Sequence, residues 1–90
     1  MTAIASITLQ NVDDARPIIE SILADNPGAR VMNMPGAVKI DCDHRLVIKR
    51  DSVEKRIGRS WTPQDIHLVL ISMAGNLDED DDYFALSWNA

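Results

Sequence analysis

The first thirty residues carry two hydrophobic periods in succession. Residues 3–10 alternate apolar and polar side chains, which predicts a half-buried strand. From about Asp13 the apolar residues recur at helical spacing, and this predicted helix ends at Asn26, Pro27 and Gly28, because the residue before proline avoids the α region and glycine accepts a left-handed turn. The apolar stripe of this helix consists of Ala15, Ile18, Ile19, Ile22 and Leu23.

A predicted hairpin follows the first helix. Residues 31–34 and 37–42 are strand-like, and Pro35 and Gly36 between them suit a type II turn, since proline presets the first turn angle and glycine accepts a positive φ. The chain is then expected to reverse at residues 43–44.

Residues 45–50 alternate again and predict another strand. A short helix is expected after it, with Asp51 or Ser52 supplying the capping oxygen and Gly58 near its end. Residues 83–88 predict the last strand, and its two sides are expected to differ. Phe84, Leu86 and Trp88 are expected to face inward, with Tyr83, Ala85 and Ser87 outward.

The segment from Trp61 to Gly75 predicts a long third helix. Thr62 is placed to cap it and Pro63 to occupy its first position, where a missing N–H costs nothing. Trp61 and Ile66 have the spacing of a hydrophobic staple. The expected core stripe is Ile66, Val69, Leu70 and Met73. Leu68 and Ile71 fall outside that stripe.

The predicted elements read β-α-β-β and then β-α-α-β-β, with no linker between them rich in Gly, Ser or Pro. We therefore expect one compact α+β domain over residues 1–90, built from two βαββ-like halves of approximately residues 1–43 and 44–90. The pattern by itself does not fix how the sheets pack.

Composition narrows the classes of partner. The 90 residues carry a formal net charge of -5, which disfavours nucleic acid and anionic membrane. No apolar run approaches the length of about 18 residues that a membrane-spanning helix needs. Cys42 is the only cysteine, so no internal disulfide is possible, and a cytoplasmic protein is expected. A protein partner or a small ligand remains.

The sequence offers little catalytic chemistry. His44 and His67 are the only histidines, and neither has a second His or Cys at metal-binding spacing. No serine lies in a nucleophile-elbow pattern. Residues 78–82 are five consecutive carboxylates, but they lack the alternation and the glycine of a calcium loop. They are interpreted as a solvated turn, or as a docking patch for basic groups of a partner.

Apolar residues in excess of the core indicate an interface. Met32 and Met34 precede the Pro35 turn, and Leu68 and Ile71 lie off the predicted helical stripe. Methionine suits surfaces that repack against a partner. Taken singly, each of these residues is equally compatible with a core covered on two sides.

Several segments together resemble a known family. They are Asp14-Ala15-Arg16, Asp25-Asn26-Pro27, Gly58-Arg59-Ser60-Trp61, the stretch from Gly75 and Asn76 to Phe84, and Leu86-Ser87-Trp88. In order and spacing these segments resemble the effector, or coupling, component of soluble bacterial multicomponent di-iron monooxygenases. The resemblance is closest to the phenol hydroxylase regulatory component, in a family that includes methane monooxygenase regulatory protein B.

This resemblance implies a fold and a function. The fold would have antiparallel sheets packed at a steep angle. The protein would hold no cofactor, would not be an enzyme, and would bind a groove on the large subunit of a di-iron hydroxylase oligomer. It would thereby gate oxygen and substrate entry and couple electrons, supplied by an NADH-dependent reductase, to aromatic hydroxylation.

The resemblance also implies contact residues. In the family the end of the long helix faces the hydroxylase, which corresponds to Ser72, Met73, Gly75 and Asn76, with Ile71 as a neighbour. Asn33 and Met34 are added because of expected exposed apolar character near the predicted turn, and no motif of the family matches them. Two other classes stay open, a small independent binding module and a structural subunit of an oligomer. Reversible binding with a change in turnover distinguishes the effector from both.

Overall fold

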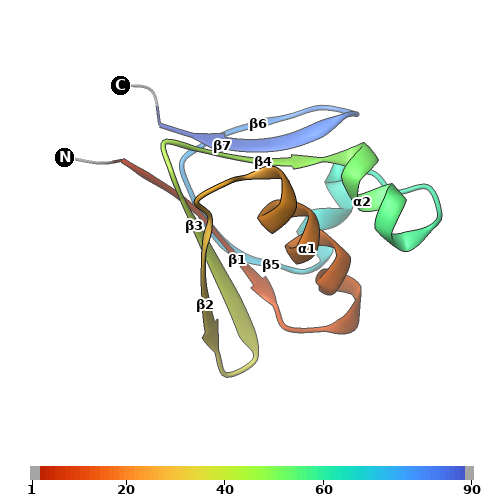
Figure 1. Ribbon diagram of the computed structural model, residues 1–90, viewed down its shortest axis with the longest axis horizontal. Helices are drawn as coiled ribbons and strands as arrows, with labels where there is room; N and C mark the ends of the chain where they lie inside the picture. The colour runs from red at the N-terminus through yellow and green to blue at the C-terminus, as the bar shows by residue number, and fades with distance from the viewer. Residues whose placement is uncertain (1–2, 89–90) are drawn as a thin grey trace.

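The computed structural model describes residues 3–88. Its strands form two antiparallel sheets, and its helices gather at the end of the molecule opposite the chain termini (Figure 1). In chain order the elements are β1 (Ile4–Gln10), the 3-10 helix η1 (Asp13–Ala15), α1 (Arg16–Asp25), β2 (Arg30–Met34), β3 (Ala37–Asp43), β4 (Arg45–Lys49), α2 (Arg50–Ile57), the 3-10 helix η2 (Pro63–Leu68), β5 (Leu70–Ala74), β6 (Asn76–Glu79) and β7 (Tyr83–Ser87).

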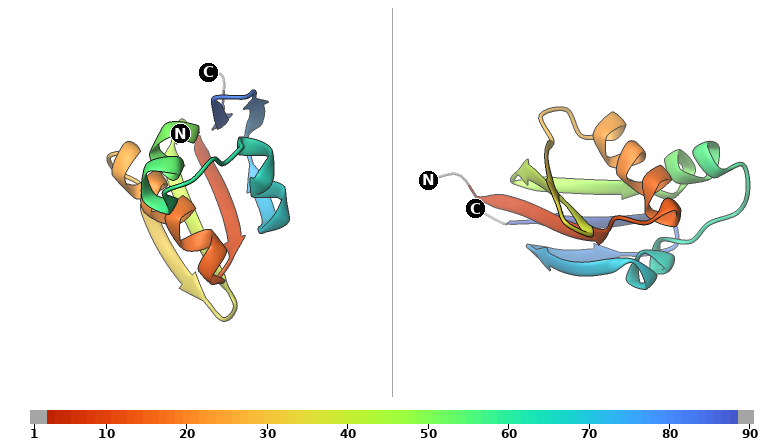
Figure 2. Two further views of the ribbon diagram at one scale, coloured as in Figure 1. Left: turned by 90° about the vertical axis from the view of Figure 1, so that its right-hand side faces the viewer. Right: turned by 90° about the horizontal axis from the view of Figure 1, so that it is seen from below.

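The strands form a four-stranded sheet in the order β2-β3-β1-β5 and a three-stranded sheet in the order β4-β7-β6. All neighbouring strands in both sheets are antiparallel. The strands of the second sheet cross those of the first at a steep angle (Figure 1). Helix α1 packs against β4 and α2 (Figures 1 and 2). The expected α+β domain with steeply crossed antiparallel sheets is therefore confirmed.

A single apolar core fills the space between the sheets and the helices. Both sheets and both α-helices contribute side chains that are fully or almost fully buried, and burying one such side chain contributes about 1.5–3 kcal/mol. These side chains include Ile7, Leu9, Ile40, Leu46, Ile48, Phe84 and Leu86 from the strands and Ile18, Ile22 and Val53 from the helices.

The chain crosses directly from one sheet to the other at two residues whose backbone has a positive φ. His44, with a φ of 67°, links β3 to β4, and Gly75, with a φ of 130°, links β5 to β6. The left-handed region is open to glycine and uncommon for other residues. Both reversals lie at the end of the molecule that carries the termini. The His44 N–H donates to Ala3 O and the Trp88 N–H donates to His44 O, while Gly75 lies close to the backbone of Ser87.

Most elements of the first half match the sequence prediction. The strand over residues 4–10, the hairpin turning at Pro35 and Gly36, and the helix ending at Asn26 are all present. Pro17 occupies the first turn of α1 because a 3-10 turn over Asp13–Ala15 precedes it. Helix α2 begins at Arg50 with no side-chain cap, so the prediction of a cap from Asp51 or Ser52 is wrong.

The prediction of a long third helix is wrong. Only Pro63–Leu68 is helical, as a 3-10 helix, and Leu70–Ala74 is strand β5. A short apolar run fits a helix and a strand about equally well in sequence. Pairing with β1 decides between them, because β5 supplies partners for the backbone groups on the free edge of β1. This pairing joins residues more than sixty positions apart.

Two further expectations for residues 61–75 need correction. The Thr62 side chain makes no capping hydrogen bond, although Pro63 does occupy the first turn of the helix. The expected core stripe holds only in part, because Ile66 and Val69 are buried whereas Met73 is 40% exposed.

In the last strand, Phe84 and Leu86 are buried as expected. Ala85 is also buried, because β7 is the central strand of its sheet. Trp88 is 42% exposed and follows Ser87, where β7 ends. Within residues 3–88 no helix is long and apolar enough to cross a membrane.

Candidate functional site: an apolar edge shared by two sheets

The candidate site is the edge of the molecule where β5 and β6 lie, one from each sheet. We call it the β5–β6 edge and define it by Ile71, Met73, Gly75, Asn76 and Leu77. Strand β5 is the last strand of the four-stranded sheet and β6 is the last strand of the three-stranded sheet. Gly75 joins the two strands, so this edge is continuous in sequence and crosses from one sheet to the other.

The strand register explains why apolar side chains reach the surface at this edge. Met73 pairs with Ile7, and Leu77 pairs with Leu86, and both of these partners are fully buried. Residues directly opposite each other in a sheet point to the same face. Met73 and Leu77 therefore point to the core side of their sheets, but as edge residues they stay partly exposed.

Ile71 is exposed for a different reason. The β1–β5 register shifts between Thr8 and Leu9, whose partners are Ser72 and Leu70. Ile71 is the extra residue at this bulge, and its side chain is 52% exposed. Bulges turn a side chain away from the regular alternation. Leu68, just before β5, is 77% exposed and extends the apolar surface toward the helices.

Gly75 is required by its surroundings as well as by its backbone angle. A Cβ at this position would lie 3.3 Å from the backbone nitrogen of Ser87 and 3.4 Å from the Cβ of Leu86. Only glycine combines a φ of 130° with this close approach to β7. The geometry of the β5–β6 edge therefore depends on this residue.

Exposed apolar groups also lie beyond Gly75, and sequence reasoning missed them. The Trp88 Nε1–H donates to Ile4 O at 2.7 Å, which holds the indole beside the start of β1. Both side chains are exposed, and both belong to the same end of the molecule as Gly75. The sequence pattern predicts that Trp88 faces inward and therefore does not indicate this exposed apolar surface.

The acidic turn after β6 is an ordered structure. The Asp80 Oδ1 accepts hydrogen bonds from the backbone N–H of Asp82 at 2.7 Å and of Tyr83 at 3.1 Å. The Tyr83 hydroxyl donates to Asp78 Oδ2 at 2.9 Å, which raises the pKa of the tyrosine, helped by desolvation. His67 Nε2 lies 3.1 Å from Glu79 Oε2.

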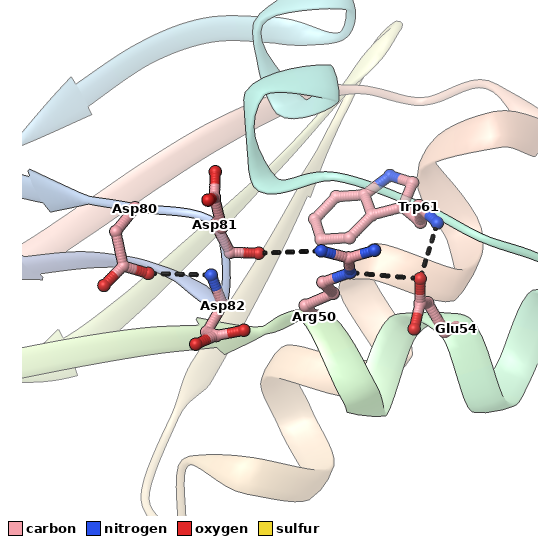
Figure 3. A network of polar contacts seen from close by, with 6 residues as sticks. All are labelled: Arg50, Glu54, Trp61, Asp80, Asp81 and Asp82. Carbon is pink, nitrogen blue, oxygen red and sulfur yellow. Dashed lines mark hydrogen bonds and ion pairs between the residues drawn. The ribbon is translucent and has the colours of Figure 1, made fainter.

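Arg50 ties this turn to α2 (Figure 3). Its Nη1 donates to Asp81 O at 3.3 Å and its Nε donates to Glu54 Oε2 at 3.1 Å. The same Glu54 oxygen accepts the backbone N–H of Trp61 at 2.8 Å. This backbone hydrogen bond, followed by the hydrogen bond from Arg50, lowers the pKa of Glu54. The turn is thereby fixed relative to η2 and β6.

The seven residues named from the sequence fall into two places. Ile71, Ser72, Met73, Gly75 and Asn76 lie together on β5, its turn and the start of β6, rather than at the end of a helix. Asn33 and Met34 lie on β2, at the opposite edge of the four-stranded sheet with β3 and β1 between.

The side chains that could support catalysis do not form a site in the described part of the chain. Between residues 3 and 88 no group of three or more His, Cys, Asp or Glu side chains is placed to hold a metal ion. Cys42 is buried, and this burial raises the pKa of its thiol. A thiol protonated at neutral pH is a poor nucleophile. The chemistry available at the β5–β6 edge is that of protein binding.

The MmoB/DmpM family model matches residues 4–87. The chain belongs to this family. It is 41% identical, over 88 residues, to the stimulatory component DmpM of phenol 2-monooxygenase from Pseudomonas sp. (strain CF600), and this alignment covers 98% of each chain. The family and its named members are regulatory components, and the role of this chain is that of a regulatory effector rather than a catalytic subunit.

Two further similar proteins support this assignment. An effector subunit of the alkene monooxygenase system of Xanthobacter autotrophicus (strain ATCC BAA-1158 / Py2) is 31% identical over 71 residues, covering 77% of this chain and 70% of that one. A chain in a solved structure of the phenol hydroxylase–regulatory protein complex superposes with a TM-score of 0.94 at 41% identity, covering 97% of this chain and 100% of that one.

Proposed function

We propose that this protein binds the di-iron hydroxylase of a phenol or related aromatic hydroxylase system and regulates its turnover. The observation that carries the proposal is the β5–β6 edge, where the core-facing residues Met73 and Leu77 reach the surface. A half-buried methionine and leucine at a sheet edge offer apolar area that a partner can cover. Membership in a family of stimulatory components supports a hydroxylase as that partner.

Regulation by binding requires different affinities for two states of the partner. If the effector binds the reactive conformation of the hydroxylase more tightly than the resting one, it raises the population of the reactive state. A tenfold shift needs only about 1.4 kcal/mol of differential affinity. The apolar area of a few side chains at the β5–β6 edge is enough to supply that difference.

The roles at the edge are divided among few residues. Met73 and Ile71 supply adaptable apolar contact, and Ser72 and Asn76 supply hydrogen-bonding groups beside them. Gly75 keeps the two strands in the required arrangement. Asn33 and Met34, on β2, are a second predicted contact at the far edge of the sheet. The effector binds to a groove on the large subunit of the hydroxylase oligomer.

The wider setting belongs to the same proposal. Residues 1–90 act as a single effector domain without a cofactor of their own. The effector gates oxygen and substrate entry and couples electrons from an NADH-dependent reductase to hydroxylation of an aromatic ring. A cytoplasmic location suits this role, because the lone Cys42 is a buried free thiol and the fold needs no oxidising compartment.

The proposal is tested by steady-state hydroxylation of phenol. Purified hydroxylase and reductase are held constant while this protein is titrated in, and product and NADH consumption are measured together. A saturable rise in product per NADH is expected. Met73→Ala and Asn76→Ala are expected to need higher concentrations for half-maximal effect, by about tenfold for a contact worth about 1.4 kcal/mol.

The matched control is Leu23→Ala. Leu23 is about as exposed as Met73, but it lies on α1, away from β5 and β6. It is expected to leave the titration unchanged. A hydroxylase that is active but indifferent to the wild-type protein would refute the effector role. Permanent stoichiometric association without any change in turnover would instead indicate a structural subunit.

A further inference from the structure

A second feature of the surface lies beside the β5–β6 edge. The helical end of the molecule contains a cavity of about 270 Å³. It lies among η1, α1, the end of α2 and η2, which gather at the end facing the viewer in the left panel of Figure 2. Its apolar lining consists of Pro17, Ile18, Val53, Ile57, Trp61, Leu68 and Val69.

Several residues that line the cavity belong to the hydrophobic core. Ile18, Val53, Trp61 and Val69 are all buried and belong to the main hydrophobic cluster. The cavity is therefore a depression that reaches core side chains from outside. Glu54 accepts the Trp61 N–H and fixes the backbone of one wall, so the depression is preformed.

The polar part of the cavity is strongly unbalanced in charge. Asp13, Asp14 and Asp65 contribute carboxylates and Arg59 contributes the one guanidinium, so three negative charges face one positive charge. All four side chains belong to exposed residues. Among the ion pairs and side-chain hydrogen bonds of residues 3–88, none involves any of the four. Their charges are thus available to an occupant.

We propose that this cavity is a socket for one basic side chain, an arginine or lysine, of the hydroxylase that the effector binds. An arginine or lysine has an apolar stem that suits the lining and a cationic head that suits the carboxylates. A tryptophan in the lining adds attraction for a cation. This inference rests on the proposed function and adds to it a specific partner chemistry at a second place.

The charged groups and the position of the cavity favour a protein side chain over a free molecule. A neutral aromatic molecule would fill the apolar part and leave the carboxylates unused. Leu68 and Val69 line the cavity and immediately precede β5, so one partner surface is able to cover both the cavity and the β5–β6 edge.

The first experiment tests the chemistry of the socket in the isolated protein. Benzamidine, benzyl alcohol and benzoate share one ring size and carry a positive, a neutral and a negative group. Each is titrated into the protein while amide and indole N–H chemical shifts are recorded. Benzamidine is expected to cause saturable shifts at Trp61 and Val69, at concentrations at least tenfold lower than the other two. Equal responses to all three probes, or no response to benzamidine, would overturn the proposal.

The second experiment tests the socket in the complex. The double variant Asp14→Asn and Asp65→Asn removes two rim charges without changing side-chain volume. The control variant Glu20→Gln and Asp51→Asn makes the same change in net charge at exposed positions outside the cavity. The rim variant is expected to bind the hydroxylase about tenfold more weakly than wild type, and the control variant less than twofold more weakly.

The outcomes separate the two proposals. If wild type binds and stimulates the hydroxylase while both double variants bind equally well, the socket is refuted and the effector role stands. If wild type itself fails to bind, both proposals fall. Amide spectra of each variant verify that it is folded.

Discussion

Asn26 pairs with the backbone of Val47 through both ends of its side-chain amide. Its Nδ2 donates to Val47 O at 2.8 Å, and its Oδ1 accepts the Val47 N–H at 2.9 Å. Val47 lies in β4, an edge strand of the three-stranded sheet. The side chain therefore pairs with backbone hydrogen-bonding groups at the edge of β4 much as a neighbouring strand would. It also links the end of α1 to the second sheet.

Replacing Asn26 by alanine should destabilise the fold. The substitution leaves the N–H and C=O of Val47, which are partly buried, without their side-chain partners, and each such hydrogen bond contributes about 0.5–1.5 kcal/mol. We expect the free energy of unfolding to fall by about 1–3 kcal/mol, measured by urea denaturation. Asn26→Asp keeps the acceptor but loses the donor, and should fall between wild type and Asn26→Ala. An unchanged midpoint for Asn26→Ala would contradict this role.

Gly75→Ala should be costly because the backbone and the surroundings both oppose it. The residue has a φ of 130°, and the new Cβ would crowd the backbone of Ser87. We expect a loss of about 1–3 kcal/mol in unfolding free energy, together with changed amide shifts along β5 and β6. Gly36→Ala is the comparison, since Gly36 also has a positive φ but its Cβ position is open. Equal losses for the two variants would show that crowding by β7 contributes nothing.

The carboxylates of the turn after β6, residues 80–82, should differ in their effects on stability. Asp80→Ala removes the acceptor for two backbone N–H groups and should cost about 1 kcal/mol, as for the loss of a capping side chain. Asp81→Ala removes a carboxylate that has no hydrogen-bond or ion-pair partner among residues 3–88 and reduces repulsion within the turn, so stability should stay the same or rise slightly. Thermal unfolding of the two variants side by side tests this difference. The reverse order would refute the capping role of Asp80.

Acid should weaken the contact between α2 and the start of η2. The folded-state pKa of Glu54 lies below its ordinary value of 4.5, so its carboxylate contributes stability above about that pH. This contribution is lost as the pH falls through the folded-state pKa. Glu54→Gln should therefore be less stable than wild type at pH 7, and the difference should shrink at pH 3.

The matched variant for this measurement is Glu20→Gln, at an exposed glutamate of α1. Urea denaturation of all three proteins at both pH values gives the comparison. A gap between wild type and Glu54→Gln that stays constant with pH would show that ionisation of Glu54 makes no contribution.

Local signals in the sequence were sufficient for much of the fold. Alternation predicts β1 and β4, and Pro35 with Gly36 predicts the hairpin turn, because these features depend on neighbouring residues. The role of Asn26 was only half visible. Its position before Pro27 indicates the end of a helix, but its bonds to Val47 join residues 21 positions apart.

The candidate site was harder to predict for the same reason. The predicted contact residues near Met73 are contiguous in the structure, but the sequence pattern predicts a helix there, and the structure has a strand. Spacing of Ile66, Val69 and Met73 imitates a helical stripe, whereas Met73 in fact faces Ile7 across a strand pair. The exposure of Trp88 depends on where β7 ends, and no pattern in the last residues marks that point.

The central place of β1 has a consequence for how the chain reaches its native state. Strand β1 lies between β3 and β5, and the second of these pairings waits for residues 70–74. During synthesis one edge of β1 must therefore stay unpaired until most of the chain has left the ribosome. Closing so long a loop slows folding, and sheets built from distant strands typically form in milliseconds to seconds. Completion of the first sheet and creation of the β5–β6 edge are one event, so a chain that has not finished folding has no edge to offer a partner.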